Sequence, residues 1–470
     1  MVRAAAAFAT GILALAGAAQ AAEGPDGAAL GLVWVAPFVG ILLSIALVPL
    51  LAPRIWHRHF GKIALFWASA FAVPYGVVYG PGAAATAVWH TLALEYVPFI
   101  ILLYTLFAVA GGILVRGDIR GTPASNTSIL AFGAMVASLL GTTGAAMLLI
   151  RPLIRANIRR PRNTHVFVFF IFLVANVGGS LTPLGDPPLF LGFLNGVSFF
   201  WTAEHLFLPM LLSSAVLLGL FYAIDTLQTR REPPVLSAND DADEQPIEIL
   251  GAHNVLLLFG VVGIVVASSL INPALGIELI GVHMPLDSLA RSAGLIVIAA
   301  ISLATTRNSV RIENAFNWDP IVEVALLFVA IFVTIIPALA ILQAGDKGAL
   351  APLVALVNNP DGSHNPAMYF WLTGILSSFL DNAPTYLVFF NTAGGDAAAL
   401  MSEAAPTLAA ISAGAVFFGA VTYIGNAPNF MIKAICEAQD VKMPGFFGYA
   451  GWAAAALLPV LALNTVVFFG

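Results

Sequence analysis

The sequence contains little charge. Only 9% of its 470 residues are Asp, Glu, Lys or Arg, whereas soluble domains typically have about 25%. With 60% apolar residues and a mean hydropathy of +0.93, the composition excludes a soluble enzyme and a nucleic-acid binder. It indicates a polytopic membrane protein, and a chain of this length has room for about ten spans of roughly 20 residues.

Cysteine pairs and alternating strands are also missing. Cys436 is the only cysteine, which excludes an intramolecular disulfide, and we interpret it as a small buried hydrophobe. A transmembrane β-barrel needs ~10-residue segments of alternating polarity, whereas residues 41–51 and 321–342 are apolar on both faces. Since no nucleophile with an adjacent base is found at membrane depth, the sequence predicts an all-α polytopic membrane protein that is not an enzyme.

The first residues are typical of a processing signal. Arg3 supplies a positive charge, residues 4–18 are apolar, and Ala19-Gln20-Ala21 is an A-x-A cleavage site. These features predict a signal peptide over residues 1–22, with an uncleaved first transmembrane helix as the alternative. The style of this signal indicates a multi-pass protein of the bacterial inner membrane.

The arginines predict a first re-entrant hairpin at about 127–150. These 24 residues are long enough to cross the bilayer, but five arginines follow within 151–162. Lysine and arginine collect in cytoplasmic loops, and a crossing would place all five outside. A hairpin with its turn at 141–144 keeps them in the cytoplasm.

The next segment predicts a broken helix at about 163–201. One continuous helix of these 39 residues would be about 58 Å long, nearly twice the ~30 Å hydrocarbon core. Glycines and prolines at 178–188 interrupt it, because proline removes amide donors and glycine lowers helix propensity.

The second half predicts the same two features. If about 366–392 crossed the bilayer, Lys433 and Lys442 would lie outside. We therefore expect a second re-entrant hairpin there, followed by a second broken helix at about 405–438.

An internal repeat relates the two halves. The pattern G-x-x-T-x-[L/I]-G-[D/N]-x-P begins at Gly179 and again at Gly419, an offset of 240, and the same offset aligns Thr142 with Asn382. The two halves have opposite orientation in this topology, so we expect inverted repeats over 32–227 and 251–470, joined by an acidic cytoplasmic linker at 228–250. Such repeats place a binding site near the bilayer midplane, between discontinuous helices.

Two carboxylates are the main candidates for that site. Asp186 lies at the first helix break and Asp381 at the second hairpin turn, and an intramembrane carboxylate is a functional hypothesis by default. Each is expected to bind either a proton or a sodium ion. Sodium would be the transported or coupling ion, and no cofactor is expected. Capping of a half-helix is the alternative role.

Neutral polar groups accompany these acids. Hydroxyl and amide oxygens suit a hard cation such as sodium and also donate to the oxygens of an anion. The surrounding segments contain no Lys, Arg or His, which favours a cation. The neutral candidates are Thr142, Thr143, Thr182, Thr385, Thr422, Asn382 and Asn426.

Three other polar residues are assigned lesser roles. We expect Glu95 near a helix start and His165 near a membrane boundary, where both side chains would be interfacial. A pH-sensing role is the alternative for the histidine. Arg291 is expected outside the membrane on the outer face.

Residues 176–188 and 380–385 resemble the ion transporter superfamily. Within it, the chain is most similar to the D-type bacterial sodium/proton antiporters and to a related citrate transporter family. The resemblance implies a transport domain of hairpins and broken helices that moves against a scaffold, usually in a homodimer. The Ser-Asn-Thr signature of the dicarboxylate branch is only partly present, whereas Gly185-Asp186 and Asp381-Asn382-Ala383-Pro384 look like the antiporter branch.

The sequence therefore predicts a secondary transporter embedded in the lipid bilayer. Exchange of sodium for protons is the first hypothesis, and sodium- or proton-coupled symport of a citrate-type carboxylate is the alternative. An anion permease of the arsenite type and a receptor or structural membrane protein are further alternatives.

Overall fold

The computed structural model describes residues 25–117, 119–232, 248–314 and 316–470. The expected signal peptide lies outside these residues, as does most of the expected linker. Within the described residues, nine helices are long and apolar enough to cross a membrane. The prediction of an all-α polytopic membrane protein is confirmed.

The first helices of the described residues form an outer wall. The α4 helix, the π-helical segment η2 and α5 form one continuous span over residues 81–110. Glu95 lies in η2, in the interior of this span, so its expected place near a helix start is wrong. The elements of this wall are η1 (Leu32–Val35), α2 (Ala36–Leu51), α3 (Pro53–Tyr79), α4 (Pro81–Thr91), η2 (Leu92–Tyr96) and α5 (Val97–Ala110).

A hairpin and an interrupted helix follow. Helices α6 and α7 pack against each other and are separated by Gly141, whose φ of +74° is one that a side chain rarely adopts. The α6 helix starts sharply because Pro123 occupies its first turn and Thr122 caps it by accepting from the Ser125 amide. The elements are α6 (Pro123–Leu140), α7 (Thr142–Asn157), α8 (Thr164–Leu173), η3 (Val177–Leu181), α9 (Pro187–Leu194) and α10 (Trp201–Arg231).

The second half repeats this order after five connecting α-helices, α11 to α15. Another packed helix pair, α16 and α17, precedes another interrupted helix, α19 to α20. The elements are α11 (His253–Ser268), α12 (Leu286–Thr305), α13 (Asn308–Glu313), α14 (Asp319–Gln343), η4 (Gly345–Lys347), α15 (Ala351–Val357), α16 (Pro366–Phe379), α17 (Asn382–Thr392), α18 (Ala397–Met401), α19 (Ala405–Phe418), η5 (Gly419–Val421), α20 (Ala427–Glu437), α21 (Phe446–Trp452), η6 (Ala453–Leu457), α22 (Leu458–Asn464) and η7 (Thr465–Phe469).

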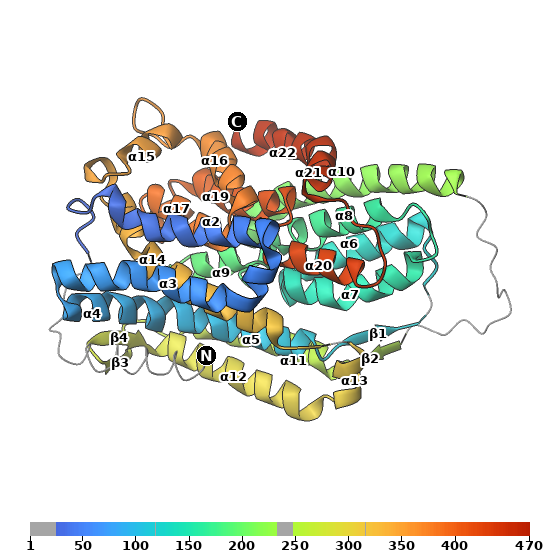
Figure 1. Ribbon diagram of the computed structural model, residues 1–470, viewed down its shortest axis with the longest axis horizontal. Coiled ribbons are helices and arrows are strands. Elements are labelled where there is room, and N and C mark those ends of the chain that lie inside the picture. The colour runs from blue at the N-terminus through green and yellow to red at the C-terminus, as the bar shows by residue number, and fades with distance from the viewer. Residues whose placement is uncertain (1–24, 118, 233–247, 315) are drawn as a thin grey trace.

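Two short antiparallel strand pairs mark the two ends of the molecule. Strands β1 (Leu114–Arg116) and β2 (Glu248–Leu250) pair at one end of the long axis, beside α13 (Figure 1). Strands β3 (Gly276–Leu279) and β4 (Val282–Pro285) pair at the other end (Figure 1). These strands were not predicted from the sequence. The long helices run between the two ends, so the long axis is the direction in which the chain crosses the bilayer.

The interrupted helices form the centre of the fold. Residues 165–173 of α8 and 407–418 of α19 are all buried, as expected for helices that are apolar on every face. The outer helices instead expose large apolar side chains, such as Val77 on α3 and Leu256 on α11. A surface of this kind suits contact with lipid and leaves the broken helices enclosed by protein.

Each break in the interrupted helices requires glycine. A Cβ atom added to Gly185 would lie 2.0 Å from the Gly179 carbonyl oxygen, and one added to Gly425 would lie 2.7 Å from the Gly419 carbonyl oxygen. Both distances are far below van der Waals contact, and the obstructing atoms belong to the backbone. The chain can fold back on itself at these two places only without side chains.

We predict that Gly185→Ala lowers the melting temperature of the detergent-solubilised protein by several degrees. The added methyl group displaces backbone at the first break, and overpacking of this kind costs about 1–3 kcal/mol. Thermal unfolding followed by size-exclusion chromatography measures the effect. Gly219→Ala in α10 is the matched control, because an added Cβ meets no atom within 4 Å there, and equal melting temperatures for the two variants would contradict the prediction.

Candidate functional site

Asp186 and Asn426 occupy equivalent positions at the two helix breaks. Each is the residue immediately before a half-helix, α9 or α20, and each has extended backbone, with φ/ψ of −144°/143° and −151°/136°. Neither side chain makes a capping hydrogen bond to its helix. The capping role considered for Asp186 is therefore wrong, and its carboxylate is directed elsewhere.

Serine and threonine side chains brace both breaks. The Thr182 hydroxyl donates to the Ser138 carbonyl, and the Thr422 hydroxyl donates to the Ser378 carbonyl. In return, the Ser138 hydroxyl donates to the Gly178 carbonyl at 2.6 Å. The Ser378 hydroxyl is shared between the Gly374 carbonyl of its own helix at 2.9 Å and the Phe418 carbonyl at 3.2 Å. Each hairpin is thus fixed to the break of its own half, and the two threonines have a structural role.

The two serines were missed in the sequence, although a signal for them existed. Ser138 and Ser378 are separated by the same offset of 240 as the recognised motifs, and each precedes its hairpin turn by three residues. An extension of the repeat alignment by a few residues would have found them.

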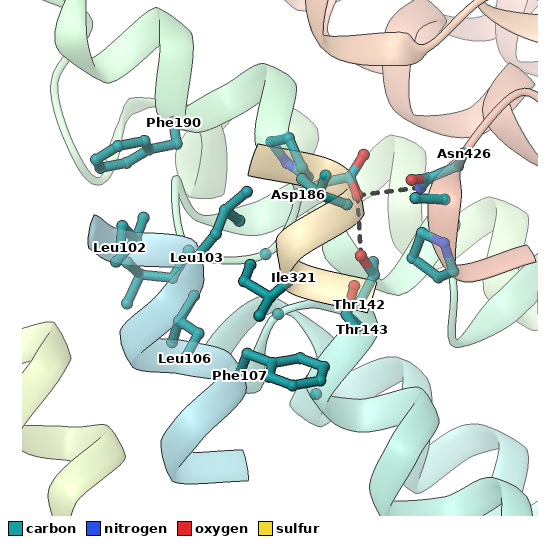
Figure 2. Close-up of a pocket in the computed structure, with 18 of the residues that line it drawn as sticks. Leu102, Leu103, Leu106, Phe107, Thr142, Thr143, Asp186, Phe190, Ile321 and Asn426 are labelled. Carbon is teal, nitrogen blue, oxygen red and sulfur yellow. Dashed lines mark hydrogen bonds between the residues drawn. The ribbon is translucent and has the colours of Figure 1, made fainter. Parts of the chain in front are cut away.

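The Asp186 carboxylate collects donors from both halves of the chain. Its Oδ1 accepts from the Thr142 hydroxyl at 2.9 Å and from the Asn426 amide at 3.1 Å, and its Oδ2 accepts from the Asn382 amide at 2.5 Å. Figure 2 shows the bonds from Thr142 and Asn426. These four residues come from two hairpin turns and two helix breaks, so Asp186 is the point at which the predicted site residues meet.

Asp381 and Asn382 bring further oxygen atoms to the same place. The Asp381 carboxylate accepts from the Ala383 amide at 3.1 Å and so caps α17, while it also lines the cavity described below. The Asn382 Oδ1 atom is buried without a hydrogen-bond partner. Carboxylate and amide oxygens are ligands for hard cations such as sodium. The described residues contain no group of three His, Cys, Asp or Glu side chains arranged for a metal ion.

Three asparagines connect the two breaks directly. The Asn176 amide donates to Asn429 Oδ1 at 2.8 Å, and the Asn426 amide donates to Asn176 Oδ1 at 3.2 Å. Asn429 in turn donates to the carbonyls of Gly419 and Thr422, at 2.7 Å and 2.9 Å. Backbone carbonyls that the break leaves without helical partners are therefore satisfied by side chains. Asn429 has no counterpart 240 residues earlier, so the repeat gave no signal for it.

A cavity of about 110 Å³ lies beside these groups, and we call it the central cavity. Polar residues form one side, and α5 residues Leu102, Leu103 and Leu106 form the opposite side (Figure 2). A single water needs about 10–15 Å³ and ligand pockets usually measure about 300–1,000 Å³, so the cavity fits a hydrated ion better than a large molecule. Of the predicted residues, Thr142, Thr143, Asp186, Asp381, Asn382 and Asn426 line it, whereas Thr182, Thr385 and Thr422 do not.

A buried charged network supports the first hairpin from the end of the molecule at which α10 terminates. Asp225 Oδ1 accepts from Arg160 at 2.6 Å and lies 2.9 Å from the His165 ring nitrogen, and Asp225 Oδ2 accepts from the Asn126 amide at 2.9 Å. The interfacial interpretation of His165 is wrong, because this side chain is buried against Asp225. No sequence pattern predicted the network, since its members are far apart in the chain.

The comparisons with known proteins agree with the architecture. A family model described as putative citrate transport matches residues 27–469, which include both hairpins and both breaks. A search of curated proteins found no match.

We predict that Asp225→Ala destabilises the protein strongly. Arg160 would remain buried without its closest carboxylate, and removal of one partner from a buried ion pair costs about 3–5 kcal/mol. Urea or thermal unfolding in detergent measures the loss. Glu313→Ala is the control, because it removes the exposed ion pair with Arg116 and exposed pairs contribute little. A loss no larger than that of the control would contradict the network's structural role.

Proposed function

The chain belongs to the family described as putative citrate transport, and we propose that it carries a citrate-type carboxylate across the bilayer together with a coupling cation. The family supports a secondary transporter of the carboxylate type. As the sequence resemblance implies, we also propose that the protein is a homodimer in the bacterial inner membrane.

The convergence of four helix N-termini on the central cavity carries this proposal. Helices α7 and α17 begin at the two hairpin turns, and α9 and α20 begin at the two breaks. The first residue of each, namely Thr142, Asn382, Pro187 and Ala427, lines the cavity. Helix N-termini carry a partial positive charge from the aligned peptide dipoles, so they attract an anion such as a carboxylate.

The two aspartates explain why a cation must accompany that anion. Asp186 and Asp381 line the cavity, and the described lining residues include no Lys, Arg or His. A carboxylate substrate would therefore meet two like charges. A sodium ion held by Asp381 and the free Asn382 Oδ1, or a proton on Asp186, reduces this repulsion. When a cation takes the oxygens of Asp186, the Thr142, Asn382 and Asn426 donors become available to the substrate.

Exchange of sodium for protons is the second candidate. It is favoured by the small size of the central cavity and by its apolar α5 side, which offer little to a tricarboxylate. In this mechanism Asp186 and Asp381 bind either sodium or protons, and no organic substrate enters the cavity. The antiporter hypothesis from the sequence thus stays a prediction.

We predict that purified protein in liposomes takes up labelled citrate when a sodium or proton gradient is imposed, and that Asp186→Asn and Asp381→Asn each lower this uptake at least tenfold. Each change removes a charge that holds the coupling cation, whereas the side-chain volume stays the same. Asp346→Asn is the matched control, because it makes the same chemical change at an exposed residue on η4, and its uptake should equal that of the unmodified protein.

An internal pH dye in the same liposomes separates the two candidates. Proton movement driven by sodium or lithium without citrate, and lost in both site variants, would replace carboxylate transport with sodium/proton exchange. Full activity in the Asp186→Asn/Asp381→Asn double variant would contradict both.

A further inference from the structure

A second and larger cavity lies at the end of the molecule that carries β3 and β4. Its volume is about 780 Å³, within the usual range for ligand pockets. It is bounded by the end of α9, the loop at 196–200, the start of α10 with Glu204, the end of α11 and the start of α12. We call it the outer cavity, because the positive charges of the loops predict that this end faces outward.

Arg291 is the unusual residue of the outer cavity. It lines the cavity from α12, at the end predicted to face outward, yet the residue is only 5% exposed. Its Nη1 has only long contacts, 3.3 Å to the Ser268 hydroxyl and 3.4 Å to Asp287, and its Nε is buried without a partner. Charge-assisted bonds are normally about 2.7–2.9 Å long, so the hydrogen-bonding capacity of this buried guanidinium is largely unused.

The guanidinium is nevertheless held in a defined orientation. Its central carbon lies 5.3 Å from the centre of the Phe193 ring on α9, which is a cation–π contact. Because the ring attracts the face of the guanidinium, the donors at its edge stay free for a ligand. A planar fork of donors matches the two oxygens of a carboxylate.

We propose that the outer cavity is a second binding site, in which Arg291 binds the carboxylate of an organic anion. The identity of this anion as the transported substrate rests on the function proposed above, but the site itself does not. A buried arginine with free donors meets little competition from water, so a carboxylate that reaches it binds more strongly than it would at the surface.

The α9 helix connects this site to the central cavity. Phe190 lines the central cavity, and Phe193, one turn further along α9, lines the outer cavity. The rings of Phe190 and Phe193 are 6.0 Å apart, and Phe99 on α5 lies 6.3 Å from Phe190. Aromatic side chains thus separate the two cavities, and a carboxylate on Arg291 is placed on the outer side of this barrier.

Asp287 opposes the binding of an anion. It lines the same cavity, and its Oδ1 is buried without a partner while Oδ2 faces Arg291. This carboxylate competes for the guanidinium and repels a second negative charge. Removal of its charge is therefore expected to strengthen the binding of an anion, whereas it would weaken the binding of a cation.

Protection of an introduced cysteine tests the site. Cys436 is the chain's only cysteine and is buried, so it is replaced by alanine, and the exposed Ser269 at the rim of the outer cavity is replaced by cysteine. Labelling with a membrane-impermeant thiol reagent is followed in proteoliposomes with increasing citrate. We expect citrate to slow labelling. The citrate concentration needed for half protection should rise at least tenfold in Arg291→Gln, and it should rise by a smaller factor in Arg291→Lys.

Two further variants make the result specific. Asp287→Asn should lower the citrate concentration for half protection, and Asp186→Asn should lose transport while it keeps the protection. Absence of protection, equal protection in Arg291→Gln, or weaker protection in Asp287→Asn would overturn the proposed site. Protection by citrate in a protein that does not transport citrate would leave the outer site intact and contradict the proposed function alone.

Discussion

The hydrogen bonding of the two interrupted helices is the constraint on which the rest of the structure depends. Backbone amides and carbonyls that leave a helix inside a bilayer must find partners within the protein. Here Ser138 and Ser378 exchange bonds with the breaks of their own halves, and Asn176 and Asn429 join one break to the other. The side chains that satisfy this constraint also fix the position of Asp186, so the candidate site is a consequence of the way in which the breaks are stabilised.

The distribution of charge follows from the same setting. Inside the bilayer, charges are costly unless they are paired or bind a ligand. At one end of the molecule, Arg160 meets this demand by forming ion pairs with both Asp225 and Glu232. Asp186 is surrounded by neutral donors instead, and Arg291 has contacts that are too long to satisfy it. The paired charges at the end of α10 stabilise the fold, whereas Asp186 and Arg291 are the charges at which we propose that ligands bind.

The sequence could predict the parts of this arrangement that depend on local chemistry. Glycine and proline at 178–188 and the duplicated motif 240 residues later indicated where helices end, and the structure interrupts its helices there. The pairing of Asp225 with His165, 60 residues apart, depends on how α8 packs against α10, and no short pattern records such packing. Thr182 and Thr422 were predicted as site residues because they lie in the repeated motif. Their hydroxyls instead donate to backbone carbonyls.

The α9 helix connects the two cavities. This helix begins at the carboxylate of the central cavity and ends beneath the arginine of the outer cavity, so its two ends present opposite charges to a migrating anion. In the proposed function, the central cavity binds a carboxylate through helix N-termini only when a cation offsets its acids, whereas the outer cavity offers the Arg291 guanidinium, for which Asp287 competes and near which Glu204 adds a second negative charge. Under these two proposals, an anion binds first at Arg291, and its entry to the central cavity depends on the coupling ion.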